Sequence, residues 1–192
     1  GKTFTAASTI LTGIAATDAG AGNSTVKVNT TSFTGTTDLS GIQTNAITFG
    51  DGSTDLTLAN SATLSIRETH LANIAGAGNV TTIADGNNIA NVNVYGFTGG
   101  VDIAEIDVGG AVTGYVSGAQ DITTDASNIE ELTALVIQSG GSLAVTQVQA
   151  NAFAATLTKE AGAGNVTSTV SGDLSALNLS AVDVLTIGAD AT

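Results

Sequence analysis

The pentapeptide Ala161-Gly162-Ala163-Gly164-Asn165 is the third copy of a stretch that also occurs at 19–23 and 75–79. Each copy is followed by a Thr-rich run in which β-branched residues, typical of strands, are frequent. Such literal recurrence indicates a chain built from copies of one supersecondary unit, each stacking on the next. The pentapeptide therefore favours a repeat architecture over an ordinary globular fold.

The sequence around the third copy gives the fullest view of the unit. Residues 134–138 and 143–145 are predicted to be short apolar strands, separated by a Ser-Gly-Gly turn. Residues 166–170 alternate apolar and polar side chains, as a half-buried strand does. Several short strands bounded by Gly, Asn, Asp or Ser thus make up one unit.

A short helix is expected between these strands. Residues 146–155 have helical spacing and no breaker, and this spacing would place Val148, Ala152 and Ala155 on one apolar face. The unit then closes with an Asp-x-Ser-x-aliphatic pattern at 173–177. The same ending occurs at 38–42 and 125–129, and each is followed by a β-branched strand.

The alignment predicts a single repeat array over residues 1–192. Its approximate units are 1–49, 47–108, a shortened 109–137, and 134–192. Because one such unit cannot bury its apolar face alone, stacking must supply a shared core. We therefore predict an all-β, repetitive parallel β-solenoid, similar to a β-helix, with at most short helical turns. The alternative is a β-sandwich, in which Val26–Val28 would pair antiparallel across a tight hairpin.

The composition agrees with a thin, layered interior. Aromatic residues make up only 4% of the chain, and Trp and Met are absent, so few large side chains could fill a thick core. Pro is also absent, and inner strands of a stacked ladder need every backbone N–H. Without Cys, the chain has neither disulfides nor thiolate metal sites.

The charge balance limits the partners. Seventeen acidic residues face four basic ones, for a formal net charge of −13, whereas nucleic-acid binding needs Lys and Arg to neutralise phosphates. We expect no nucleic-acid partner; divalent cations are compatible with this charge, and so is a simple solvated acidic face. No apolar stretch approaches the roughly 18 residues of a membrane helix. The opening Gly-Lys-Thr, without a signal segment, suggests a mature form or a fragment.

The chain resembles the low-complexity β-strand repeat regions of bacterial surface-layer proteins and giant secreted adhesins. The resemblance is carried by the Ala-Gly-Ala-Gly-Asn-Val-Thr turns, by residues 142–152 and by the ending at 173–177. It implies an extracellular or cell-surface protein that is long, assembled and without catalytic activity. The Gly-Gly-x-Gly-x-Asp nonapeptides through which such proteins often bind calcium are missing, so calcium is not carried over from the family.

One calcium candidate is indicated by the residues themselves, independently of the family resemblance. Asp51, Ser53 and Asp55 place oxygen-bearing side chains at alternate positions, as the start of a calcium loop does. The remainder of an EF-hand loop is missing, since Leu56 stands at the sixth position, where that loop has Gly. A polar turn between two strands explains the same three residues, and no other cofactor is indicated.

Catalytic chemistry has little support in the sequence. His70 is the only histidine, and the chain has no Gly-x-Ser-x-Gly elbow and no glycine-rich phosphate loop followed by Lys and Ser or Thr. We therefore expect no enzyme. A pair of like charges, Glu105 and Asp107, is expected on one face of a strand at 103–108, where it needs solvent, a cation or a basic neighbour. A contact between stacked subunits could supply Lys27 or Lys159 as that neighbour.

Two functional hypotheses follow. The first is a structural repeat protein of a bacterial surface layer, extracellular filament or long adhesin stalk, which self-associates into homo-oligomers or polymers through strand edges. The alternative is a carbohydrate- or surface-binding module of an adhesin or phage fibre. A glycan site usually needs an exposed aromatic platform, and Tyr95, Phe97 and Tyr115 are the aromatic residues close enough in sequence to offer one.

Overall fold

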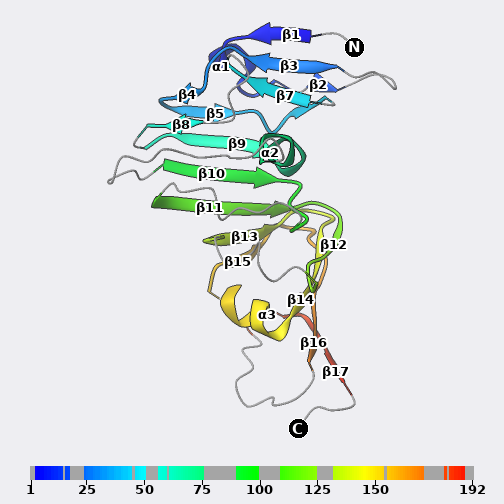
Figure 1. Ribbon diagram of the computed structural model, residues 1–192. Coiled ribbons are helices and arrows are strands. Elements are labelled where there is room, and N and C mark those ends of the chain that lie inside the picture. The colour runs from blue at the N-terminus through cyan, green and yellow to red at the C-terminus, as the bar shows by residue number, and fades with distance from the viewer. Residues whose placement is uncertain are drawn as a thin grey trace.

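The chain forms a β-solenoid in which strands of successive levels lie side by side along one axis (Figure 1). The computed structural model describes residues 3–14, 16–17, 24–44, 46–50, 56–59, 61–75, 90–99, 109–124, 132–153, 155–170, 180 and 182–188. All strand pairings among these residues are parallel. The predicted parallel solenoid is confirmed, and the β-sandwich alternative is wrong: Val26–Val28 lies between two parallel neighbours.

Within the described ranges, the strands gather into three main sheets and two small ones. The first sheet has the order β1 (Thr3–Ala6), β3 (Thr25–Val28) and β7 (Ala46–Phe49). The six-stranded sheet runs β15 (Leu157–Lys159), β13 (Ala134–Ile137), β11 (Gly109–Val116), β10 (Ala90–Tyr95), β9 (Thr63–Arg67) and β5 (Thr36–Asp38). The four-stranded sheet runs β12 (Ala119–Asp121), β14 (Ser142–Thr146), β16 (Val166–Val170) and β17 (Val184–Ile187). The small sheets pair β2 (Ala16–Thr17) with β6 (Ile42–Gln43), and β4 (Ser32–Phe33) with β8 (Thr57–Leu58).

The structural repeat is one level of the solenoid. Tyr95, Tyr115, Val136 and Thr158 are in register on consecutive strands, so a level in this part uses about 20 residues. The strands that follow the first and third pentapeptides, β3 and β16, belong to different sheets. The literal repeat thus does not place the strands after these two pentapeptides beside each other. In the six-stranded sheet, the neighbours of β11 and β13 come from adjacent levels about 20 residues away.

Inward-facing side chains stack into columns that form one continuous core. In the six-stranded sheet, Val92 and Val94 are buried and pair with Leu64 and Ile66 of the preceding level. The core is built of Val, Leu, Ile and Ala with a few Phe, and Phe33 meets Phe49 edge to face at 6.0 Å between ring centroids. Burying one such aliphatic side chain contributes about 1.5–3 kcal/mol, so stability accumulates level by level.

The third pentapeptide forms a corner of the solenoid between β15 and β16. Gly162 adopts φ +82°, a conformation that glycine tolerates best, and its carbonyl accepts a 2.9 Å hydrogen bond from the Gly140 N–H of the preceding corner. At Gly141 a Cβ would lie 2.5 Å from the Val116 carbonyl oxygen, so only glycine fits there. Small residues recur at these corners because successive corners stack in close backbone contact.

In the part of the chain that the structure describes, three short helices interrupt the levels: α1 (Ser8–Leu11), α2 (Glu68–Ala75) and α3 (Gln147–Phe153). The segment that ends α1 reaches β5, the edge of the six-stranded sheet, and Gly13 N–H donates a 2.9 Å hydrogen bond to the Asp38 carbonyl. Helix α2 packs against β7. Among the described residues no helix has the length and apolar character to cross a membrane.

Helix α3 confirms the predicted helix but not its predicted face. Val148 is 78% exposed, and Ala152 and Ala155 are exposed too. The buried side chains are Gln149, Ala150 and Phe153, which cover β14 and β16. The sequence prediction followed small apolar residues, whereas burial follows Phe153, the residue with the most apolar surface to remove from water.

Candidate functional site

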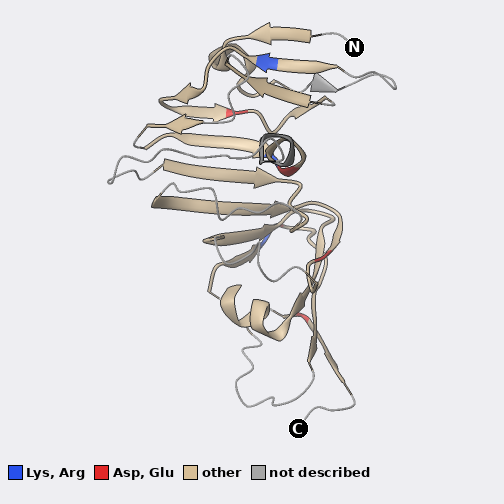
Figure 2. Cartoon of the chain, viewed as in Figure 1, with Lys and Arg blue, Asp and Glu red and all other residues tan. Residues whose placement is uncertain are grey.

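The calcium candidate Asp51, Ser53 and Asp55 lies outside the described residues, as do Glu105 and Asp107. Within the described ranges, no group of three or more His, Asp or Glu residues is placed to hold a metal ion. The charged residues of this part are few and are spread along the length of the solenoid (Figure 2).

Two described carboxylates close local turns. Asp38 Oδ1 accepts hydrogen bonds from the Ser40 N–H at 3.0 Å and the Ser40 hydroxyl at 2.6 Å. Asp121 makes the same pair of bonds with Thr123, at 3.0 Å and 2.6 Å, and these bonds lower the pKa of the Asp121 carboxyl. The Asp-x-Ser pattern at 38–42 thus forms a self-bonded turn, and Asp-x-Thr at 121–123 is a further instance that sequence alignment missed.

Glu68 is a buried carboxylate that joins two levels. It begins α2 and is 3% exposed. Its oxygens accept hydrogen bonds from the Thr98 N–H at 2.7 Å, the Thr98 hydroxyl at 2.6 Å and the Gly99 N–H at 3.1 Å. Three donors from one turn satisfy a charge that would otherwise be costly to bury. Glu68 therefore fixes the turn after β10 to the start of α2.

His70 lies on the same helix, α2, and its side chain is buried. Its exposed fraction is 1%, and its Nε2 lies 3.1 Å from the Thr44 carbonyl oxygen, to which it donates as the neutral tautomer. Nδ1 is buried without a hydrogen-bond partner. Burial lowers the pKa of His70, and the nearby Arg67 charge acts in the same direction. A neutral imidazole enclosed in this way packs the helix and is not presented to a substrate.

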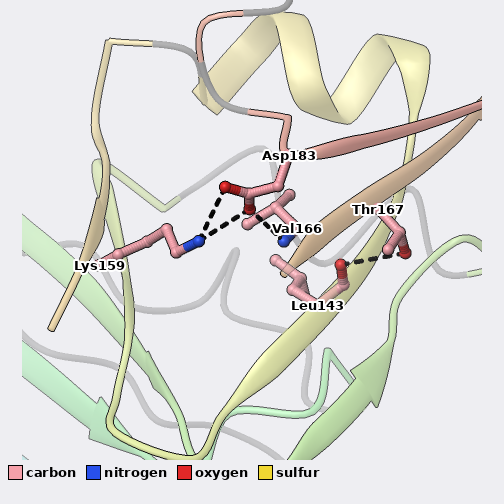
Figure 3. Close-up of polar contacts among 5 residues, drawn as sticks. All are labelled: Leu143, Lys159, Val166, Thr167 and Asp183. Carbon is pink, nitrogen blue, oxygen red and sulfur yellow. Dashed lines mark hydrogen bonds and ion pairs between the residues drawn. The ribbon is translucent and has the colours of Figure 1, made fainter. Parts of the chain in front are cut away.

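Lys159 and Asp183 form an ion pair near the last described strand (Figure 3). The Lys159 Nζ lies 2.9 Å and 2.8 Å from the two carboxylate oxygens, one of which also accepts a 2.6 Å hydrogen bond from the Val166 N–H. The Lys159 contact, followed by the Val166 bond, lowers the pKa of the Asp183 carboxyl. Lys159, considered above as a partner for Glu105 or Asp107, is engaged within its own chain.

Tyr95 and Tyr115 are the side chains of the predicted aromatic platform that face outward. They are half-buried neighbours on β10 and β11, with ring centroids 4.3 Å apart and planes 6° from parallel. Burial, and then the neighbouring Tyr115, raises the pKa of Tyr95. Phe97 is fully buried and cannot belong to a surface platform.

The stacking of the two tyrosines limits what their surface can bind. Each ring uses one face on the other, and the next residues in register along this column are Arg67 and Val136. A sugar that stacks on an aromatic residue needs an open ring face. Because one face of each ring is used in the stack, the pair offers less open ring area for glycan binding than two separate rings would.

Large apolar side chains are exposed on the two outermost described strands, β1 and β17. Phe4 on β1 is 57% exposed although its partner in register, Val26, is buried. At the other end Ile187 on β17 is 60% exposed although its partner, Val170, is buried. Both side chains belong to inward-facing columns, and no further described strand covers them. The sequence signal for these surfaces was only the general expectation of open strand edges.

The chain matches no protein-family model, no curated protein and no solved structure.

Proposed function

We propose that this chain is a non-enzymatic structural repeat protein of a bacterial cell surface, within a surface layer, an extracellular filament or an adhesin stalk, and that it self-associates. The observation that carries the proposal is the open stack: Phe4 and Ile187 end inward-facing columns whose other members are buried. Covering such columns with another level removes apolar surface from water. A solenoid without covered ends favours association with its own kind.

The polar groups of the described part support a structural role. His70 is buried and neutral, and Glu68 is committed to the turn after β10. Each described carboxylate accepts a hydrogen bond from within the chain: Asp38, Glu68, Asp121, Glu160 and Asp183. Catalysis needs titratable groups aimed at a reacting atom, whereas these groups hold levels and turns together.

The cell-surface assignment follows from the resemblance to surface-layer and adhesin repeat regions. The continuous parallel ladder and thin aliphatic core are compatible with an element that spans distance. Stacking of this kind adds length without needing a large globular core.

Sedimentation equilibrium over a wide concentration range, together with negative-stain microscopy, tests the proposal. We expect concentration-dependent oligomers, and fibres or sheets at high concentration. A monomer at every concentration, seen as isolated particles, would contradict self-association. A glycan array on the same preparation tests the alternative, because selective binding would favour a carbohydrate-binding module.

A further inference from the structure

The backbone of β1 presents hydrogen-bonding groups away from the solenoid. Asn29 N–H donates a 2.8 Å hydrogen bond to the Ala6 carbonyl, so Ala6 directs its backbone groups toward β3. In a parallel ladder, successive residues of a strand point their N–H and C=O groups to opposite sides. The backbone groups of Thr3 and Thr5 therefore point away from β3, at the outer edge of the first sheet.

The backbone of β17 has the matching arrangement at the opposite end. Gly188 N–H donates a 2.8 Å hydrogen bond to the Val170 carbonyl, and Val170 is in register with Ile187. By the same alternation, Leu185 and Ile187 direct their N–H and C=O groups away from β16. β17 is the last strand of the four-stranded sheet, so these groups lie at an outer edge.

Both edges show the same relation between the side chain of a residue and the direction of its backbone groups: residues with inward side chains direct their N–H and C=O groups toward the next level. Val28, Val116 and Val170 come from three different sheets, and all three are buried residues whose carbonyls bond to the next level. Ile187, in the column of Val170, continues this rule toward a level beyond β17. At the β1 edge, the N–H and C=O groups of Thr5 are the corresponding partners, because they point outward to where a level before β1 would lie. A parallel pair of β17 with β1 thus keeps the pattern of the internal ladders.

We propose that copies of this chain join head to tail by adding β1 of one copy to β17 of another as a parallel pair; the inference rests on the self-association proposed above. The hydrogen-bond phase places Leu185 and Ile187 opposite Phe4 and Ala6, so the exposed inward-facing side chains cover one another. Thr186 then lies beside Thr5 on the outer face. The contact is heterologous, since it joins two different edges, and it continues along an axis rather than closing as a symmetric dimer.

Proline substitutions test this interface, because proline removes an N–H and leaves the strand extended. Thr5→Pro removes an N–H that faces the outer edge, and Ile187→Pro does the same at the opposite edge. We expect each variant to weaken self-association at least about tenfold in sedimentation equilibrium, since a lost hydrogen bond and a steric block act together. The matched variants Thr5→Val and Ile187→Val keep the N–H and should assemble like the parent chain.

Mixing the two proline variants gives the sharper result. Thr5→Pro retains an open β17 and Ile187→Pro retains an open β1, so neither should polymerise alone, yet an equimolar mixture should form a one-to-one heterodimer. Circular dichroism and melting temperature check that each variant is folded, and Thr3→Pro provides a second edge variant if Thr5→Pro is not. If the parent chain assembles and both proline variants still assemble equally well, the β17–β1 interface is overturned while self-association stands. If the parent chain remains monomeric, both proposals fail.

Discussion

His70 shows how burial converts the only histidine into a pH-dependent element of stability. Its Nε2 bonds to the Thr44 carbonyl, and burial lowers the pKa of the imidazole. The folded state therefore resists protonation, whereas the unfolded chain takes up a proton near the ordinary pKa of about 6.5. Because the unfolded state binds more protons, the free energy of unfolding falls as the pH falls below that value.

Replacing His70 should remove this dependence. As the pH falls below about 6.5, the parent chain should lose up to about 1.4 kcal/mol of stability per pH unit from this group until the folded protein also takes up the proton, and His70→Gln should lose correspondingly less. Urea unfolding of the two proteins at several pH values measures the difference. Equal slopes in this window would mean that His70 is protonated in the folded state.

The Lys159–Asp183 pair should make a modest, acid-sensitive contribution. Its side chains are 32% and 37% exposed, so solvent screening limits the coupling to roughly 0.2–1 kcal/mol. Because the pKa of Asp183 is lowered, this contribution is present above the unfolded pKa near 4 and is lost as the pH falls through the folded pKa. A double-mutant cycle of Lys159→Met and Asp183→Asn, followed from pH 7 down to the acid unfolding of the protein, measures it. Coupling of zero at pH 7 would contradict the ion-pair account.

The spacing of Asp51, Ser53 and Asp55 in the sequence is the sole basis of a calcium prediction. If these oxygens hold calcium, millimolar calcium should raise the melting temperature more than magnesium at equal ionic strength, and Asp51→Asn with Asp55→Asn should abolish the difference. Asp121→Asn serves as a control, since its carboxylate is bonded to Thr123. A melting curve that a chelator leaves unchanged would support the simple polar turn.

At the scale of single elements, the alternation of apolar and polar residues predicted strands well, whereas helical spacing predicted the buried face of α3 poorly. Val166–Val170 is a strand with alternating burial, as expected. A two-residue period fixes both faces of a strand at once, so few residues suffice to recognise it. α3 is only seven residues long, and its buried face includes Gln149, whose amide donates to the Ile122 carbonyl at 2.8 Å. A polar residue buried by a tertiary hydrogen bond has no signature in the local pattern.

Substitutions on the two faces of α3 should differ in how much they reduce the stability of the protein. Phe153 is 3% exposed, so Phe153→Ala should destabilise the protein by about 3–5 kcal/mol through lost burial and a cavity. Val148 is 78% exposed, and Val148→Ala should change stability by less than about 0.5 kcal/mol. Denaturant unfolding compares the two variants directly. Similar losses for both would mean that the helix buries the face predicted from small residues.

For the whole molecule, the sequence predicted a stacked architecture but not which segments form successive levels of the solenoid. The three pentapeptides are far apart in the chain, whereas neighbours in the ladder such as Tyr95 and Tyr115 share no literal motif. Corner geometry constrains residue size and backbone conformation, so glycine recurs without a fixed spacing. Which surface residues lie side by side, including the stacked tyrosines, depends on the register between strands of successive levels, and the sequence alone does not give that register.

The net charge of −13 opposes the stacking of one copy on another, and this sets the expected salt dependence. The Debye length falls from about 10 Å at 0.1 M ionic strength to about 3 Å at 1 M, so added salt screens the repulsion between copies. The proposed apolar contact of Phe4 and Ala6 with Leu185 and Ile187, and the backbone hydrogen bonds, do not need long-range attraction. We therefore expect the dissociation constant of self-association to fall several-fold between 0.05 and 0.5 M NaCl, with KCl giving the same result. Weaker association at high salt would instead show that ion pairs between copies, and not burial of the open columns, hold the assembly together.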